Sequence, residues 1–420
     1  MTSVEAPGRV VGLAAGAAPE VAREPAVVGR NLTKAYGLSA RQASRALRQP
    51  DPAQAVADAG GFLGARDVSF SIQRGEMFVV MGLSGSGKST VLRMINRLNE
   101  PTAGHLMIEG EDITQVSDAR LRELRNQKIG MVFQHFSLFA HRTVRDNAAY
   151  GLKVRGVGKA ERREKAEAAL HRVGLGDRGD KYPHELSGGM RQRVGLARAL
   201  AVDPPILLMD EPFSALDPLI RRDMQDLLLQ LQAEDARTTV FVTHDLNEAM
   251  RIGDQIMVMR EGQVVQCAPG PEIVAHPADD YVHEFVADVD RARVLTASDL
   301  ARPALLTLSV REDPAKALRR LGENEATGAF VVGDDERLLG VATDGRLVEA
   351  AHRGDPDVER AIGQEFHTVE PGAVVGDFMH LAGRQVVPVT VVDEQGRLTG
   401  VVPRATILSS LSHVREATHG

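Results

Sequence analysis

The strongest constraint on the fold is a glycine-rich stretch that directly follows a short apolar run. Residues 78–81 are all apolar, and Gly82 to Thr90 then match the pattern G-x-x-x-x-G-K-[ST]. Glycines let the backbone curl so that successive N–H groups converge on phosphate oxygens, and a helix starting near Lys88 adds the positive end of its dipole. The pattern predicts a strand, a phosphate-binding loop and a helix, which together indicate a nucleotide-binding α/β fold.

The polar positions of this loop have separate predicted roles. Lys88 reaches the β- and γ-phosphates of a nucleotide, and the Ser89 hydroxyl ligates Mg²⁺. From average residue frequencies, a random chain of this length matches the pattern in about one case in a hundred, and the preceding strand lowers that chance further. The positions expected to bind the nucleotide are Gly82, Ser84, Gly85, Ser86, Gly87, Lys88, Ser89 and Thr90.

Two later apolar runs end in polar residues in the same way. Residues 206–209 precede Asp210 and Glu211, and residues 240–242 precede Thr243 and His244. Short apolar runs with helical patterns between them predict buried parallel strands, whose carboxyl ends carry ligands in open α/β sheets. Asp210 is expected to hold Mg²⁺ directly or through water, and Glu211 to accept a proton from the attacking water. An Asp-Glu pair is weak evidence alone, but after a phosphate-binding loop it indicates a P-loop NTPase.

A second glycine-rich helix start lies at Leu186 to Gln192. Ser187 suits an N-cap, and Gly188 and Gly189 expose backbone N–H groups, so this is another anion-binding helix terminus. One γ-phosphate does not readily need both helix starts from the same subunit. Here the chain resembles the ABC ATPase family, whose LSGGQ signature it carries with Met190 in place of Gln.

The resemblance to ABC ATPases covers about Val28 to Ala287 and implies a P-loop ATPase domain with a helical subdomain at about 135–190. In that family the signature of one subunit closes on the ATP held by a second copy. The resemblance therefore implies nucleotide contacts from Ser187, Gly188, Gly189 and Gln192 across a dimer interface. It assigns ATP and Mg²⁺ as cofactors.

The remaining family positions occur in the expected order. Gln134 matches the Q-loop glutamine that senses Mg²⁺ and the membrane subunits, and Asp217 matches the D-loop aspartate. His244 matches the switch histidine, which joins Glu211 and Lys88 as a catalytic residue by contacting the γ-phosphate. Tyr36 stands where the family stacks an aromatic ring on adenine, although packing remains an alternative role.

Composition limits the cellular setting. The net charge is −7, which argues against sequence-independent nucleic-acid binding, because such binding needs a basic face. Cys267 is the only cysteine, so an intrachain disulfide is impossible and a reducing compartment is expected. No stretch approaches the roughly 18 apolar residues of a membrane span, and no signal peptide is recognised at the N-terminus. These features predict a cytoplasmic protein, and the resemblance to ABC ATPases implies a peripheral one at the cytoplasmic face of the inner membrane.

The rest of the chain divides by changes in pattern. Residues 1–27 are expected to form a flexible tail, 37–64 a helical insertion and 288–302 a linker. Beyond the linker, Val331-Val332 and Gly340-Val341 recur 60 positions later as Val391-Val392 and Gly400-Val401. The recurrence predicts two α+β units, 303–352 and 356–412, that pack together as one module spanning 303–413.

The insertion, the loop at 80–90, the signature helix at 186–200 and the C-terminal pair resemble glycine betaine/proline importer ATPases, which carry two CBS motifs. The resemblance implies ATP-driven import of quaternary amines with a transmembrane permease and, indirectly, a substrate-binding protein. The CBS pair implies a nucleotide or ionic-strength signal. Thr343-Asp344 suits a ribose, whereas Pro403-Arg404 replaces that pair in the second unit. A purely dimerising role for the pair is the alternative.

Other readings remain open. Phe136, Phe139 and Tyr150 are candidate contacts to the permease, or they belong to the core of the helical subdomain. The cargo is alternatively methionine or a polar amino acid. A soluble ABC protein of DNA repair or translation is disfavoured because no second ATPase domain or long coiled coil is visible, and a vestigial ATPase because Lys88 and Glu211 are intact.

Overall fold

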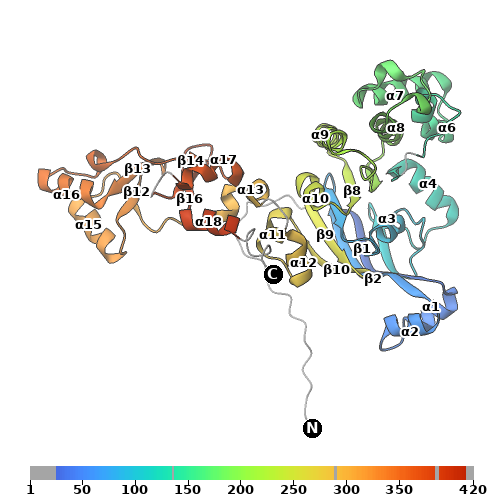
Figure 1. The fold of residues 1–420 in the computed structure, drawn as a ribbon, viewed down its shortest axis with the longest axis horizontal. Coiled ribbons are helices and arrows are strands. Elements are labelled where there is room, and N and C mark those ends of the chain that lie inside the picture. The colour runs from blue at the N-terminus through green and yellow to red at the C-terminus, as the bar shows by residue number, and fades with distance from the viewer. Residues whose placement is uncertain (1–24, 135–136, 288–290, 384–386, 413–420) are drawn as a thin grey trace, which may run out of the picture.

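The computed structural model describes residues 25–134, 137–287, 291–383 and 387–412 (Figure 1). An N-terminal ATPase-like domain is followed by a C-terminal module built from two similar halves. Among the described residues, no helix is both long enough and apolar enough to cross a membrane.

The domain is built on a six-stranded sheet with strand order β10-β9-β3-β8-β7-β6, parallel except for β10. Its strands are β3 (Met77–Met81), β6 (Ile129–Val132), β7 (Ile206–Asp210), β8 (Thr238–Thr243), β9 (Gln255–Arg260) and β10 (Gln263–Ala268). Strands β3, β7 and β8 are buried at every position, as expected for parallel strands covered on both faces.

The two faces of this sheet contact separate cores. Met77, Val79 and Met81 of β3 belong to the core shared with the helical subdomain, whereas Phe78 and Val80 belong to the core beneath a second sheet. The second sheet is antiparallel, with order β2-β1-β4-β5. Its strands are β1 (Pro25–Tyr36), β2 (Phe62–Gln73), β4 (Ala103–Ile108) and β5 (Glu111–Asp112). Alternate side chains of β3 thus pack on opposite sides of the large sheet, one set toward the helical subdomain and the other toward the second sheet.

Helices surround the two sheets. Beside them lie α3 (Lys88–Ile95), α4 (Asp118–Lys128), α9 (Pro218–Asp235), α10 (Leu246–Ile252), α11 (Gly270–Ala275) and α12 (Asp280–Val286). A separate lobe contains α5 (Val144–Ala148), α6 (Tyr150–Val154), α7 (Lys159–Arg172), η1 (Gly176–Arg178), η2 (Pro183–Glu185) and α8 (Gly188–Leu200). Figure 1 shows α6, α7 and α8 together in this lobe, away from α3.

The insertion contains two short helices, α1 (Ala40–Ala46) and α2 (Pro52–Asp58). Ser39 caps the first in a capping box, and Asp51 caps the second. Two expected boundaries need correction, the end of the insertion and the end of the N-terminal tail. Residues 62–64 belong to β2 because they pair with β1, so the insertion ends earlier than 64. Residues 25–27 belong to β1 rather than to a tail, since Ala26 and Val27 are buried.

The C-terminal module repeats one arrangement twice, which agrees with the 60-residue recurrence. The expected start of the second unit at 356 needs correction, because Val358 and Ala361 are buried in the core of the first half. The first half contains β11 (Thr307–Ser309), α15 (Pro314–Glu323), β12 (Gly328–Val332), β13 (Leu338–Thr343), α16 (Asp344–Arg353) and η3 (Glu359–Ala361). The second contains β14 (Thr368–Val369), α17 (Val375–Phe378), η4 (Met379–Gly383), β15 (Val389–Val392), β16 (Leu398–Val402) and α18 (Arg404–Ser412). Phe330, Val341 and Val401 share one buried cluster, so the halves pack together.

The expected linker at 288–302 is wrong over most of its length. Residues 288–290 lie outside the described residues, but α13 (Arg291–Val294) and α14 (Ala297–Leu300) follow directly. Val375 N donates to Leu295 O at 2.9 Å, and Ala297 N donates to Ala373 O at 2.8 Å. Ala297 is fully buried. This segment is therefore part of the second half of the module, because its backbone groups and apolar side chains are satisfied there.

Candidate nucleotide site

Three neighbouring strands end at one edge of the large sheet. In the order β3-β8-β7, their last residues are Met81, Thr243 and Asp210. Because the three strands are parallel, the phosphate-binding loop, His244 and Glu211 follow at the same edge. This placement agrees with the sequence prediction.

The backbone of the loop requires its glycines. Gly82 has φ 150°, and a Cβ there would lie 2.2 Å from Met259 O. Gly87 has φ 99°, and a Cβ there would lie 2.4 Å from Gly64 O. Side chains at these positions would force the loop open. The Ser86 hydroxyl is buried and has no hydrogen-bond partner among the described residues, which suits a site for a phosphate oxygen.

Lys88 is prepared for an anion. Its side chain is 5% exposed, and Nζ donates to Gly82 O and Leu83 O, both at 2.8 Å. Burial lowers the pKa of Lys88, although the nearby carboxylates Glu211 and Asp210 oppose that shift. Neutral carbonyls hold the ammonium in place without cancelling its charge. A polyphosphate entering the loop therefore meets a desolvated cation.

The predicted Mg²⁺ ligands Ser89 and Asp210 are in direct contact. Ser89 Oγ donates to Asp210 Oδ1 at 2.8 Å, and Arg93 forms an ion pair with Asp210 Oδ2 at 3.1 Å. A hydroxyl and a buried carboxylate beside a phosphate site fit Mg²⁺, which takes one or two protein oxygens together with phosphate and water. Arg93 holds the carboxylate in the orientation that faces Ser89. The described residues contain no cluster of three or more His, Cys, Asp or Glu side chains suited to another metal.

Glu211 is the meeting point of three segments. His244 Nδ1 and Glu211 Oε2 are 3.1 Å apart, and Gln134 Nε2 donates to the same oxygen at 3.4 Å. Glu211 has φ 44°, a left-handed conformation that is uncommon outside glycine and that concentrates at functional sites. Its N–H is bound by Val242 O at 3.1 Å, which fixes the turn. The carboxylate is thus aimed by the backbone and held by two polar side chains.

The second glycine-rich helix start has a different construction. Ser187 caps α8 by accepting a hydrogen bond from Met190 N at 3.3 Å, as predicted. A Cβ on Gly188 would meet open space, whereas one on Gly189 would lie 2.4 Å from Ile220 Cγ2. Ile220 is in the first turn of α9, whose N-cap is Asp217. Gly188 therefore leaves the helix start open, and Gly189 lets it dock on α9.

The predicted nucleotide contact from Gln192 needs correction. Its side chain is 1% exposed, and both amide atoms lack a hydrogen-bond partner among the described residues. Because the side chain is enclosed by the surrounding protein, it is not accessible to a nucleotide. We therefore leave Gln192 out of the site.

Comparison with known proteins identifies the family. Residues 65–214 match the ABC transporter family model, and residues 297–353 match the CBS domain model. The chain is 44% identical over 383 residues to the glycine betaine/carnitine transport ATP-binding protein GbuA of Listeria monocytogenes, covering 91% of this chain and 96% of GbuA. The chain belongs to the ABC transporter ATP-binding proteins. It is an ATP-binding subunit with a CBS domain.

Further relatives agree. The glycine betaine/proline betaine transport system ATP-binding protein ProV of Salmonella typhimurium is 44% identical, with 91% of this chain and 96% of ProV covered. The trimethylamine N-oxide transport system ATP-binding protein TmoW of Ruegeria pomeroyi is 43% identical, with 78% and 95% covered. Among solved structures, CbiO1 of Clostridium perfringens, part of the ABC transporter complex CbiONQ, superposes with a TM-score of 0.52 at 26% identity, covering 64% of this chain and 97% of CbiO1.

Tyr36 of this ABC subunit lies beside the phosphate loop, as its predicted role requires. Its hydroxyl is 3.3 Å from Thr90 Oγ1 and accepts from Asn99 Nδ2 at 2.8 Å. Its ring, however, already stacks on Phe62. Sequence reasoning missed Phe62 and Arg93. Two features of the sequence could have indicated them: Phe62 is an aromatic residue at the end of the insertion, and Arg93 follows Ser89 by one helical turn.

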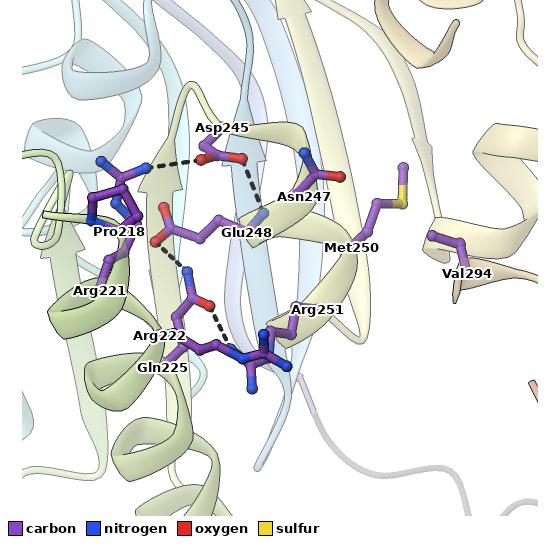
Figure 2. A pocket seen from close by; sticks show the side chains of 10 residues that line it. All are labelled: Pro218, Arg221, Arg222, Gln225, Asp245, Asn247, Glu248, Met250, Arg251 and Val294. Atoms are coloured by element: carbon purple, nitrogen blue, oxygen red, sulfur yellow. Dashed lines mark hydrogen bonds and ion pairs between the residues drawn. The ribbon is translucent and has the colours of Figure 1, made fainter. Parts of the chain in front are cut away.

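A cavity of about 500 Å³ is lined by residues of α9, of α10 with its N-cap, and by Val294. Arg221 donates to Asp245 at 3.0 Å, and Gln225 donates to the buried Glu248 at 3.0 Å (Figure 2). Arg251 in turn donates to Gln225 Oε1 at 2.8 Å. These hydrogen bonds link α9 to α10 and its N-cap Asp245, and Arg221 Nε is buried without a partner among the described residues.

Proposed function

We propose that this subunit binds ATP with Mg²⁺ and powers import of quaternary amines such as glycine betaine. The observation that supports this choice of cargo is the 44% identity to GbuA and ProV over 91% of the chain. That span includes most of the C-terminal module. The assembled edge with Lys88, Asp210, Glu211 and His244 supports hydrolysis. Methionine or polar amino acid import is the alternative cargo.

The site we propose is shared between two copies. The phosphate loop and the start of α8 belong to separate parts of one chain, as Figure 1 shows for α3 and α8. Leu83 in the loop is 56% exposed, and Leu219 beside the D-loop Asp217 is 71% exposed. A second copy that places Ser187 and Gly188 over the loop would cover these apolar side chains. ATP would then lie between the two subunits.

In hydrolysis, Glu211 accepts the proton of the attacking water and His244 contacts the γ-phosphate. The approach of Gln134 and His244 to one Glu211 oxygen supports this assignment. Bound Mg²⁺ supplies charge neutralisation beside Ser89 and Asp210. The residues of this chain mainly position groups and stabilise charge, which is how phosphoryl transfer is generally catalysed.

The partners follow from the same assignment. We place the protein peripherally at the cytoplasmic face of the inner membrane, on a permease that receives cargo from a substrate-binding protein. The helical lobe is the proposed docking site. The rings of Phe139 and Tyr150 are in tilted contact, with centroids 4.5 Å apart and an interplanar angle of 50°, and Arg142 lies over both rings, so they form one half-buried cluster in that lobe. Phe136 lies outside the described residues.

The CBS pair is the proposed regulatory part. Thr343 is the N-cap residue of α16, and Asp344 begins that helix, so a hydroxyl and a carboxylate stand together at a helix start. At the equivalent place in the second half, Pro403 precedes α18 and Arg404 begins it. We propose one nucleotide or ionic-strength signal at the first half, with simple dimerisation as the alternative.

The test is ATP-driven uptake of labelled glycine betaine by vesicles that contain this subunit, its permease and its substrate-binding protein, across a range of internal salt. We expect salt-dependent uptake that disappears with Glu211→Gln. Labelled methionine under the same conditions distinguishes the alternative cargo. ATP hydrolysis without betaine uptake would leave the ATPase assignment standing and remove the cargo assignment.

A further inference from the structure

The two ends of the insertion meet as a cross-strand pair. In the β1–β2 register, Ala35 faces Leu63 and Tyr36 faces Phe62. Since neighbouring residues of a strand point to opposite faces, the two pairs lie on opposite sides of the hairpin. Ala35 and Leu63 pack in the small core formed with the insertion helices. Tyr36 and Phe62 lie on the other side, where Tyr36 contacts Thr90.

The ring of Tyr36 is already occupied. Phe62 stacks on it with centroids 5.1 Å apart and an interplanar angle of 22°. Lys34 Nζ lies over the same ring, 5.3 Å from its centroid, and is held there by Glu100 O at 2.8 Å. The hydroxyl is fixed between Thr90 and Asn99. Tyr36 is therefore half-buried and anchored at its edge and over its face.

Phe62 is the exposed member of this pair, with 62% of its surface accessible. It is also close to the phosphate loop. Gly64, two residues along β2 and so roughly 7 Å away, has its carbonyl against Gly87. A Cβ on Gly64 would lie 2.5 Å from the Tyr36 ring, so the glycine allows this aromatic pair to approach the loop.

We propose that Phe62 is the platform on which the adenine of ATP stacks, and that Tyr36 is a positioning residue behind it. The inference rests on the proposed ATP site and names a specificity-determining residue for it. The insertion then has a structural purpose: its two helices fix the end of β2, and with it the open face of Phe62. A flat aromatic face attracts a purine through stacking.

The chain has no tryptophan, so Phe62→Trp creates a single fluorescent reporter in the full-length protein. We expect its emission to change on titration with ATP and to stay constant with inorganic triphosphate, which lacks a base. Val154→Trp, an exposed apolar position at the end of α6 in the helical lobe, is the matched control and should respond to neither. A Phe62→Trp signal that ignores ATP while ATP is being bound would overturn the proposal.

A second set of variants measures the contribution to affinity. Phe62→Ala should raise the KM for ATP about ten-fold, on the scale of one base–aromatic stack, with kcat largely retained. Inhibition by inorganic triphosphate should not change. Phe62→Leu keeps an apolar side chain but no aromatic face, so its KM for ATP should stay raised. Phe62→Trp keeps an aromatic face, so its KM for ATP should be close to that of the unchanged protein.

The outcomes separate this inference from the proposed function. An unchanged KM in Phe62→Ala, with loss of ATP binding in Tyr36→Ala, would return the adenine contact to Tyr36 and leave the ATPase assignment intact. Equal weakening of ATP and triphosphate would indicate a distorted loop and contradict the stacking role. ATP hydrolysis that survives Lys88→Ala would instead refute the proposed ATP site itself.

Discussion

The two glycine-rich helix starts of the ATPase domain differ in the groups that surround them. Around the phosphate loop, Lys88 at the start of α3 meets Asp210 and Glu211 at the end of β7. At the start of α8, Ser187 serves as the cap and Gly188 borders open space. One end concentrates charge and proton-accepting groups, and the other offers backbone donors on an exposed surface. The difference indicates that a single copy carries two incomplete halves of a site.

The largest expected effect tests the charged half. Glu211→Gln should lower the ATPase rate by about a thousand-fold while ATP binding persists, because the amide cannot accept a proton. Steady-state hydrolysis and nucleotide-binding assays measure the two quantities. Glu325→Gln is the matched control, since Glu325 also has a left-handed φ, 48°, but lies in the CBS module. Retained turnover in Glu211→Gln would remove its role as the base.

The uncharged half should respond differently. Ser187→Arg places a bulky side chain at the open helix start, so hydrolysis should fall about a hundred-fold or more while each monomer still binds ATP. Ser117→Arg removes the equivalent cap of α4 and serves as the control. Turnover compared with binding in dilute protein gives the answer. Loss of monomer binding in Ser187→Arg would contradict a site shared between copies.

The contact that joins the second half to the D-loop helix gives a smaller effect. Gly189→Ala puts a Cβ 2.4 Å from Ile220 Cγ2 and should destabilise the packing of α8 on α9 by about 1–3 kcal/mol. Gly188→Ala meets open space and should change stability much less. Thermal unfolding of the two variants measures the difference. Equal melting temperatures would show that α8 shifts without cost.

The smallest effect concerns pH. Burial raises the pKa of Glu248 behind the charged edge, although hydrogen bonds from Thr243 and Gln225 oppose the shift. Because the folded protein then holds this proton more tightly than the unfolded chain, the contribution to stability is complete below about pH 4.5 and is lost as pH rises through the raised value. Glu248→Gln should flatten this part of the melting-temperature profile. An unchanged profile would show that burial does not raise the pKa of Glu248.

Much of the charged half was predictable because its signals are local. The glycine spacing and the apolar runs specify the loop at Gly82 and the strand ends at Asp210 and His244. The left-handed turn of Glu211 was not predictable, since it depends on a bond to Val242 in another strand. The burial of Gln192 and the stack of Phe62 on Tyr36 likewise depend on tertiary contacts.

The misassigned linker shows the same limit at a larger scale. Residues 291–302 have no strong period of their own, and their partners near Ala373 and Val375 lie more than 70 positions later. Sequence patterns indicate the structure that a segment forms with residues close to it in the sequence. They do not indicate a pairing with residues far along the chain, which forms only when the rest of the module has folded.

That pairing has a consequence for the order in which the protein is made. The half of the CBS module whose core receives α13 and α14 is the half synthesised last, and the earlier half lies farther from the ATPase domain (Figure 1). During translation, the connecting segment with α13 and α14 therefore cannot pack until the end of the chain has been synthesised. A frameshift or premature stop after the first half would leave a finished ATPase with an unfolded connector, which exposes an apolar segment to proteases.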